Sequence, residues 1–428
     1  DSIAVLTLTS GGEPSMFQWA HLLPTNHDKT PYLISDLLPF DAHKTDFSAQ
    51  IEALEAELSR HSALQTASDK EKALLVSVRT HSQKKQTDSL SELRDLLITA
   101  GLIPAETLVQ KVHAINPKHI LGKGKLAELE VLALQAGAST LVYDCELTPA
   151  QMRNLAEITE RKILDRTQVI LDIFAQHATS REGKLQVELA QLDYTLPRLV
   201  GKNRALSRLA GGIGGRGPGE TKLEMDRRRI KARRTRVNQE LAKIRKQRKA
   251  TRSRRSRAGL PIVGLVGYTN VGKSTLLNTL TKSSVSTADK LFATLDPTNR
   301  RLRLAEDTEI IVTDTVGFIS YLPEYLRQAF MATLEELDAA DLLVHVADAS
   351  HPEIENQCRA VIQILQEMNL HQVPRILALN KWDQTDAATR IRLHNLFEEA
   401  IPISATRTPS LEPLIQKIHS RLPSRILS

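Results

Sequence analysis

The chain has 428 residues, of which 41% are hydrophobic and 25% are charged, and its formal net charge is +7. This length predicts two or three domains, each with enough apolar residues for a core. No run of eighteen apolar residues and no charged leader before an apolar stretch occurs, so we expect neither a membrane span nor a secretory signal. Cys145 and Cys358 lie far apart in different predicted domains, which argues against a disulfide and favours the reducing cytoplasm.

Positive charge is concentrated in one segment. Residues 198–257 hold 22 Lys and Arg but only 4 Asp and Glu, a net charge of +18. All other residues together therefore carry −11, since the whole chain carries +7. Such a local excess predicts a polyanionic partner for this segment.

The first part of the chain is the least informative. Within residues 1–70, only residues 46–61 have helical apolar spacing, and we assign the region no chemistry. Across residues 71–180, predicted strands at 73–78, 106–115, 140–143 and 163–164 alternate with predicted helices at 89–100, 124–136 and 148–159, the last with Thr148 as its N-cap. This alternation predicts a parallel α/β domain. The Gly-Lys-Gly-Lys turn at 122–125 could hold a phosphate, but a plain turn is the favoured reading because the full dinucleotide fingerprint is missing.

Residues 181–257 predict a long antiparallel helical hairpin. Leucines step by four and three between Leu185 and Leu199, although Pro197 is expected to kink or interrupt this helix. Residues 211–220 contain six glycines, a composition that no helix survives. A second apolar seam begins at Leu223, and two helices joined by a short loop fold back on each other.

Two interpretations compete for this hairpin. A charged coiled coil can be a mere spacer, but acidic partners within the segment are scarce, so we expect that most arginines are unpaired and attract RNA phosphates. We favour RNA over an acidic protein or an anionic membrane, and shape and backbone contacts over base stacking, because few aromatic residues accompany the charge. The candidate RNA-binding residues are Arg216, Lys222, Arg227, Arg228 and Arg229.

Residues 267–274 read Gly-Tyr-Thr-Asn-Val-Gly-Lys-Ser, a phosphate-binding loop between a predicted strand at 261–266 and a predicted helix at 274–280. Backbone N–H groups of such a loop wrap nucleotide phosphates. Lys273 is expected to reach the outer phosphates, and the Ser274 hydroxyl is expected to bind Mg²⁺.

Two further segments predict a nucleotide-dependent switch. Thr294, preferred over Thr298, is expected to bind Mg²⁺ only when the γ-phosphate is present. Asp314, after a predicted strand at 309–313, is expected to hold the metal through water, and the Gly317 N–H is expected to contact the γ-phosphate. Lys273, Thr294 and Gly317 are thus the candidate catalytic residues.

The identity of the base is predicted by residues 380–383, Asn-Lys-Trp-Asp, which follow a predicted strand at 375–379. The Asp383 carboxylate can accept hydrogen bonds from guanine N1–H and its amino group, which adenine does not offer, so this side chain should select GTP over ATP. Residues 403–406, Ile-Ser-Ala-Thr, are expected to contact the guanine oxygen through a backbone N–H.

The order of these motifs resembles translation-factor-type GTPases, and residues 211–228, 163–167, 171–176 and 181–192 resemble the HflX family. The resemblance implies a Ras-like GTPase domain that uses Mg²⁺ and GTP, and a protein that binds the large ribosomal subunit with its glycine loop directed at the peptidyl-transferase centre. We expect a monomer. It also implies that the protein splits or rescues stalled ribosomes. Relatives often carry a further C-terminal domain, for which residues 408–428 leave no room. We divide the chain into an extension (1–70), an α/β domain (71–180), a hairpin (181–257) and a GTPase domain (258–428). The predicted nucleotide contacts are Gly267, Tyr268, Thr269, Asn270, Val271, Gly272, Lys273, Ser274, Thr275, Phe292, Ala293, Thr294, Leu295, Asp296, Asp314, Thr315, Val316, Gly317, Asn380, Lys381, Trp382, Asp383, Ser404, Ala405 and Thr406.

Phe318 stands where Ras-like enzymes have a glutamine that orients water, so intrinsic hydrolysis is expected to be slow and stimulated by the ribosome. Two alternatives remain open. The protein could use GTP to time assembly of the large subunit, or the α/β domain could remodel RNA with ATP. The second alternative is weaker because residues 71–177 contain no phosphate loop.

Overall fold

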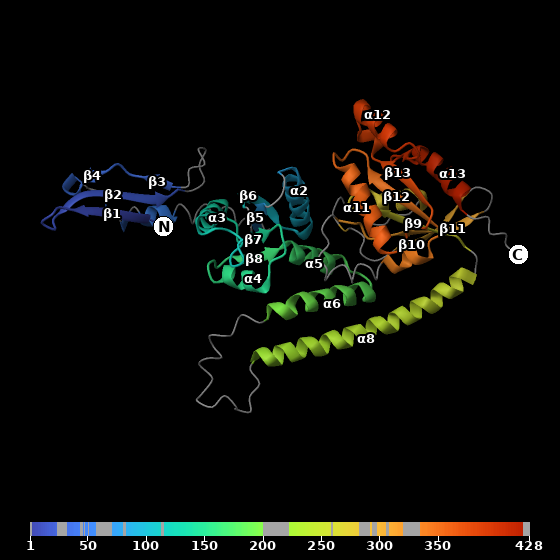
Figure 1. Cartoon of the computed structure of the whole chain (residues 1–428), viewed down its shortest axis with the longest axis horizontal. Coiled ribbons are helices and arrows are strands. Elements are labelled where there is room, and N and C mark those ends of the chain that lie inside the picture. The colour runs from blue at the N-terminus through green and yellow to red at the C-terminus, as the bar shows by residue number, and fades with distance from the viewer. Residues whose placement is uncertain are drawn as a thin grey trace. The chain divides into compact units, whose positions relative to one another are not determined.

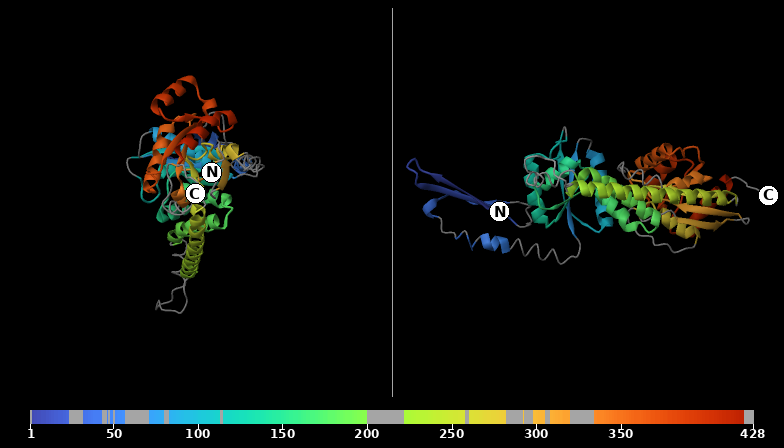
Figure 2. Two further views of the ribbon diagram at one scale, coloured as in Figure 1. Left: turned by 90° about the vertical axis from the view of Figure 1, so that its right-hand side faces the viewer. Right: turned by 90° about the horizontal axis from the view of Figure 1, so that it is seen from below.

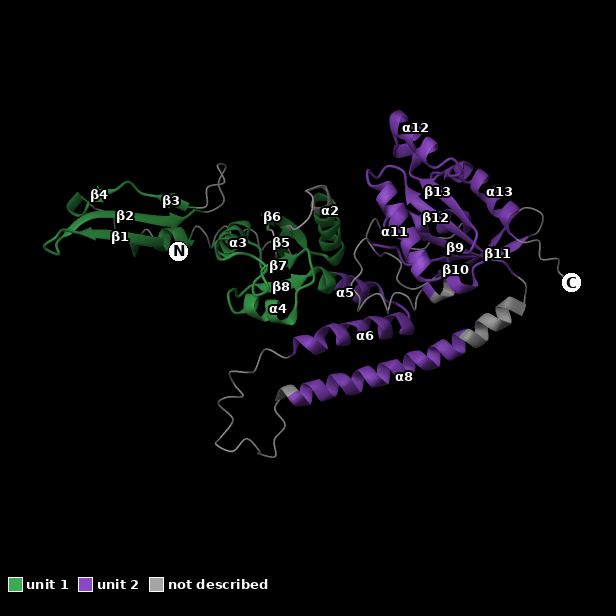
Figure 3. Ribbon diagram, in the orientation of Figure 1, with its two compact units in different colours: residues 1–169 green, residues 170–428 purple. Residues whose placement is uncertain are grey.

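A computed structural model describes residues 2–23, 32–42, 46, 48–49, 51–56, 71–79, 83–112, 115–199, 222–257, 260–281, 292, 298–304, 308–319 and 334–422. The chain forms two compact units, residues 1–169 and residues 170–428 (Figure 3). In the described part, no helix is both long and apolar enough to cross a membrane. The expected amphipathic helix near residue 50 is present at residues 48–49 and 51–56.

The first unit begins with a small antiparallel sheet that the sequence did not predict. Strand β2 (Pro14–Leu22) is central and pairs with β1 (Ser2–Leu8), β3 (Tyr32–Ile34) and β4 (Leu38–Pro39) (Figure 1). A 3₁₀ turn, η1 (Phe40–Ala42), follows β4.

The rest of the first unit is the predicted parallel α/β domain. Its sheet has the order β6 (Ile103–Lys111), β5 (Lys72–Arg79), β7 (Thr140–Tyr143) and β8 (Lys162–Asp165), and all three pairings are parallel. Helices α2 (Gln83–Ala100), α3 (Lys123–Ala136) and α4 (Pro149–Ala156) connect the strands, as the alternating pattern indicated. Thr148 caps α4 in a complete capping box with Gln151, which confirms the predicted N-cap.

A buried arginine of this domain forms ion pairs with residues of two other elements. Arg166 begins α5 (Arg166–His177) and forms ion pairs with Glu92 of α2 and, at 2.9 Å, with Asp144 after β7. Its side chain is 5% exposed, and those of Glu92 and Asp144 are 12% and 8% exposed. Burial raises the pKa of Asp144, while the neighbouring guanidinium acts in the opposite direction. Because charges so far from water need partners, this cluster fixes α2 and α5 at the ends of the strands.

Two helices of the second unit form the predicted hairpin. Helix α6 (Arg181–Arg198) and helix α8 (Lys222–Arg257) lie side by side (Figures 1 and 2). Pro197 lies in the last turn of α6, which ends one residue later, so the helix is terminated rather than kinked. The glycine-rich loop, with Arg216, lies outside the described residues.

The remaining part of the second unit is built on a six-stranded sheet. Its order is β10 (Thr298–Arg303), β11 (Glu309–Asp314), β9 (Ile262–Gly267), β12 (Leu342–Asp348), β13 (Arg375–Asn380) and β14 (Ile401–Pro402). Only β10 is antiparallel to its neighbour. Among the described residues of this part, the helices are α9 (Lys273–Thr281), α11 (Ile354–Glu367), α12 (Ala387–Leu396) and α13 (Glu412–Arg421), with 3₁₀ turns η3 (Glu335–Ala339), η4 (Trp382–Gln384) and η5 (Thr408–Leu411).

Replacing Arg166 tests the buried cluster. Arg166→Met keeps an unbranched side chain but leaves Glu92 and Asp144 buried without their cation, so we expect the free energy of unfolding to fall by about 3–5 kcal/mol. Lys162→Met is the matched control, because Lys162 pairs with Glu71 at 3.5 Å while 52% exposed. That variant should lose less than about 1 kcal/mol. Urea denaturation measures both, and equal losses would contradict the role of the cluster.

Candidate functional site

The predicted phosphate loop connects β9 to α9 and has the backbone that such a loop needs. Asn270 and Gly272 both have positive φ angles, 60° and 89°. At Gly272, a Cβ atom would come within 2.4 Å of the Asn380 side-chain nitrogen. Glycine is therefore required here for two reasons, the left-handed backbone and the close approach of Asn380.

The side chain of Asn380 supports the phosphate loop through hydrogen bonds. Its Nδ2 donates to the Val271 carbonyl oxygen at 2.7 Å, and its Oδ1 accepts from the Ala405 N–H at 2.8 Å. Asn380 is 2% exposed at the end of β13. One buried amide thus joins the phosphate loop to residues 404–406, which the sequence assigns to the base. The Ala405 N–H is engaged by Asn380, so the predicted contact of this segment with a guanine oxygen stays a prediction.

Lys273 lies at the first position of α9 and is 6% exposed. Its Nζ donates to the carbonyl oxygens of Gly267 at 3.1 Å and Tyr268 at 2.7 Å. Burial lowers the pKa of Lys273 to about 8, against the opposing effect of the Asp314 carboxylate. The ammonium group therefore sits across the loop, where a phosphate would meet it.

The residues that should hold Mg²⁺ fit a hard cation. The Ser274 hydroxyl donates to Oδ2 of Asp314 at 2.6 Å, so two oxygen ligands of the kind that Mg²⁺ prefers face each other. In the same loop, Oγ1 of Thr269 is buried and has no hydrogen-bond partner among the described residues, as expected of a site shaped for additional polar atoms. Thr294, the other proposed ligand, lies outside the described residues, as do Ala293, Leu295 and Asp296.

The segment after β11 is hydrogen-bonded to the phosphate loop. The Phe318 N–H donates to the Gly267 oxygen at 3.0 Å, and the Thr269 N–H donates to the Phe318 oxygen at 2.8 Å. At Gly317, a Cβ atom would meet Cα of Thr269 at 2.7 Å and Nζ of Lys273 at 3.0 Å. Gly317 therefore packs closely against the loop, next to the hydrogen bonds of Phe318. The Phe318 ring is buried, with 1% of the residue exposed.

The predicted base-reading residues meet at the ends of β13 and β14. Oδ1 of Asp383 accepts a hydrogen bond from the Ser404 hydroxyl, which is the main cause of the lowered pKa of Asp383. The carboxylate is thereby oriented and kept ionised. Lys381 has a left-handed backbone, with φ of 59°, and its Nζ forms an ion pair with Asp348 at 2.7 Å.

Sequence reasoning missed several contacts that support the site. Asp348, at the end of β12, orients Lys381, although no motif includes it. The Thr279 hydroxyl of α9 donates to the Ala405 oxygen at 2.6 Å, a tertiary contact without any signal in the local pattern. Ser404 was assigned to the site, but its action through Asp383 was not foreseen. Of the RNA-binding candidates, Arg227, Arg228 and Arg229 are exposed on α8, whereas Arg216 and the Lys222 side chain lie outside the description.

Family models and known proteins match most of this chain. Family models match residues 87–175 ("GTP-binding GTPase N-terminal"), 177–255 ("GTP-binding GTPase Middle Region") and 262–381 ("50S ribosome-binding GTPase"). The GTPase HflX of Caldanaerobacter subterraneus subsp. tengcongensis is 46% identical over 356 residues, covering 83% of this chain and 82% of the relative. That of Escherichia coli K12 is 42% identical over 358 residues, covering 83% and 84%. The crystal structure of the SsGBP and GDP complex is 27% identical with a TM-score of 0.48, covering 82% of this chain and 98% of that chain.

Substituting Gly317 tests the contact between the two segments. In Gly317→Ala, the new methyl group would press on the Thr269 backbone and on Lys273, so we expect GTP turnover to fall at least tenfold, as displacement of catalytic groups by about 1 Å does. Gly124→Ala is the control, since a Cβ there meets nothing within 4 Å. Phosphate release measures both variants. Wild-type turnover in Gly317→Ala would show that the contact is unimportant for catalysis.

Proposed function

This chain belongs to the GTPase HflX family, and from that premise we propose that it couples GTP hydrolysis to binding of the large ribosomal subunit. The binding surface that we propose is the outward face of α8, which lies opposite the apolar contact of this helix with α6 and includes Arg228 and Lys246. Members of this ribosome-associated type hydrolyse GTP, and so does this chain. The finer proposal is that it splits or rescues stalled ribosomes. It is supported by the charge distribution of the hairpin and by the family model described as a 50S ribosome-binding GTPase.

Within the nucleotide site, each residue has a role that its contacts support. Lys273 neutralises the outer phosphates, and the loop that Asn380 supports presents its N–H groups to them. Asp383, oriented by Ser404, reads the guanine edge. Ser274 and Thr294 would hold Mg²⁺, with Asp314 acting through water. When bound, the metal neutralises charge on the β- and γ-phosphates.

The position after Gly317 offers no group to orient the attacking water. Phe318 is an aromatic residue whose ring is buried, so it neither accepts a proton nor aligns a nucleophile. We propose that intrinsic hydrolysis is slow and that the ribosome stimulates it.

Several arginines of the hairpin form ion pairs beside its apolar seam. Leu185 of α6 and Val237 and Leu241 of α8 form a buried apolar seam. Ion pairs flank this seam: Arg248–Glu182 at 2.8 Å, Arg233–Glu188 at 2.5 Å, Arg234–Asp193 at 2.6 Å and Arg181–Glu240 at 2.9 Å. The acidic residues of α6 lie before residue 198 and so were not counted in the segment 198–257. Several arginines of this segment are therefore paired, whereas most were expected to be unpaired.

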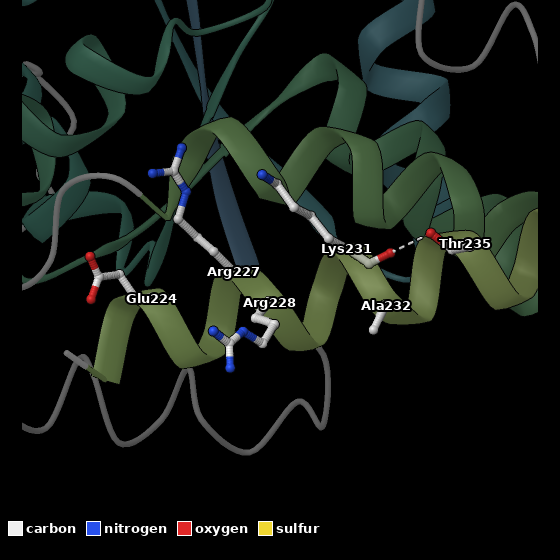
Figure 4. Close-up of a pocket in the computed structure, with 6 residues that line it drawn as sticks. All are labelled: Glu224, Arg227, Arg228, Lys231, Ala232 and Thr235. Carbon is white, nitrogen blue, oxygen red and sulfur yellow. Dashed lines mark hydrogen bonds between the residues drawn. The ribbon is translucent and has the colours of Figure 1, made fainter. Parts of the chain in front are cut away.

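The opposite face of α8 is basic and exposed. At 100° per residue, Arg228 and Lys246 lie opposite the apolar seam, with Lys231, Arg236 and Lys243 beside them. Among the described residues, no carboxylate lies within ion-pair distance of Lys231, Arg236 or Lys246. Arg227 and Lys231 point to the same side of a shallow pocket on this helix (Figure 4). From Arg228 to Lys246 the helix extends for about 27 Å, a length that spans several phosphates.

Exchanging the base specificity tests the guanine assignment. Asp383→Asn should lose GTP affinity at least a hundredfold and gain XTP affinity, because an amide can donate to the xanthine 2-oxygen where the carboxylate accepted from guanine. Competition of GTP, XTP and ATP against a fluorescent nucleotide measures the change. Asp386→Asn is the control, because Asp386 caps α12 nearby and reads no base. Undiminished preference for GTP in Asp383→Asn would disprove the assignment.

Removing the outward charges tests the RNA contact. The triple variant Lys231→Ala, Arg236→Ala and Lys246→Ala should bind large ribosomal subunits more weakly and lower the slope of log K against log salt by about two. Co-sedimentation over a range of salt concentrations, with a non-hydrolysable GTP analogue, measures the slope. Basal GTP turnover should be unchanged.

A matched variant removes the same charge from the seam side. Arg181→Ala, Arg233→Ala and Arg234→Ala abolish three ion pairs within the hairpin and should change the slope much less. Equal slopes for the two triple variants would mean that net charge alone acts. Binding that does not respond to salt would contradict an RNA contact by α8.

A further inference from the structure

Phe292 has an unusual backbone for an aromatic residue. Its φ angle is 55°, in the left-handed region that residues with large side chains rarely adopt. The residue is nevertheless 2% exposed, so its ring is seated among other side chains rather than turned to solvent. A left-handed conformation is unfavourable for a residue with a large side chain, and it persists only where packing compensates for it.

The contact that compensates comes from α5. The rings of Phe292 and Phe174 meet edge to face, with centroids 4.7 Å apart and planes at 90°. Phe174 is itself 2% exposed and precedes α6, the first helix of the hairpin, by seven residues. Such pairs prefer this geometry because the positive ring edge meets the negative ring face. Phe174 is far from every nucleotide motif in the sequence, and it lies in the segment 171–176, to which the sequence assigned no role in the nucleotide site.

We propose that Phe174 is a positioning residue for GTP hydrolysis, which acts by holding Phe292 in its left-handed conformation. Thr294 follows Phe292 by two residues, and chain geometry keeps their Cα atoms within about 7 Å of each other. We therefore expect a fixed Phe292 to favour the metal-binding role predicted for Thr294. This step rests on the proposed role of Thr294 as a metal ligand.

The strained backbone of Phe292 depends on this contact. Without the ring contact to Phe174, no packing compensates for the left-handed backbone of Phe292, and we expect this residue to adopt an ordinary backbone conformation. The ring contact thus links α5, directly before the hairpin, to the segment that responds to the nucleotide. A link of this kind lets events at the hairpin alter the hydrolysis rate without any contact to GTP.

Hydrogen–deuterium exchange of the full chain, bound to a non-hydrolysable GTP analogue, tests the contact directly. In Phe174→Ala, the peptide that contains Phe292 should exchange at least threefold faster than in the wild type. Ile173→Ala is the matched control, because Ile173 is also buried on the same helix but has no aromatic ring. Its exchange at this peptide should stay within twofold of the wild type.

Steady-state kinetics test the consequence for catalysis. Loss of one aromatic pair should lower kcat about fivefold in Phe174→Ala, with GDP affinity within twofold of the wild type. Phe174→Met retains apolar volume and a sulfur–ring contact, so it should recover kcat to within about twofold. The double variant Phe174→Ala, Phe292→Ala should be no slower than the slower single variant, since both remove the same contact.

The outcomes separate this inference from the metal-ligand assignment. Thr294→Ala with wild-type kcat would disprove that assignment, while faster exchange and a lower kcat in Phe174→Ala would still support the positioning role. Unchanged exchange and kcat in Phe174→Ala would overturn the inference. Equal effects of Ile173→Ala would overturn it as well, because Phe174 would then contribute only to packing.

Discussion

The nucleotide site depends on one buried amide. A phosphate loop must present backbone N–H groups to its ligand, so the loop cannot hold its shape with those same groups. Asn380 supplies the missing support from outside, by donating to the Val271 oxygen and accepting from the Ala405 N–H. Because both ends of the amide are satisfied away from water, losing either partner would leave a buried polar group unpaired. Gly272 is required by the same contact, since any side chain there would displace Asn380.

The sheet order explains why distant motifs converge on this amide. Strands β9, β12 and β13 are parallel neighbours, so the residues after each strand emerge at one edge of the sheet. The phosphate loop follows β9, Asp348 ends β12, and Asn380 ends β13. The ion pair between Lys381 and Asp348 joins two of these strand ends directly. Motifs separated by more than a hundred residues thus form one site.

Much of this could be predicted from the sequence, because short motifs at strand ends carry their own chemistry. The parallel α/β domain followed from alternating strands and helices, the hairpin from two apolar seams around a glycine-rich loop, and the GTPase fold from the order of the nucleotide motifs and the family resemblance. The boundaries of β6 were wrong, since the strand runs from Ile103 to Lys111 rather than over residues 106–115. Apolar patterns place a strand centre better than its ends, which depend on pairing with β5. The N-terminal sheet was missed because β1, β3 and β4 are exposed along their whole length, so no alternation of buried and exposed residues marks them.

Contacts between residues far apart in sequence could not be predicted, and the arginines show why. Composition counts charges but does not reveal which carboxylate each one meets. Arg166 is buried with two acids and stabilises the α/β domain, whereas Arg233 and Arg234 pair with acids of α6. Glu182 near the start of α6 pairs with Arg248, whereas Asp193 near its end pairs with Arg234, as an antiparallel arrangement of the two helices requires. The charge that remains on the outward face, including Lys231 and Arg236, is not needed by the fold. That remainder, rather than the net charge of +18 in residues 198–257, is what an RNA partner can use.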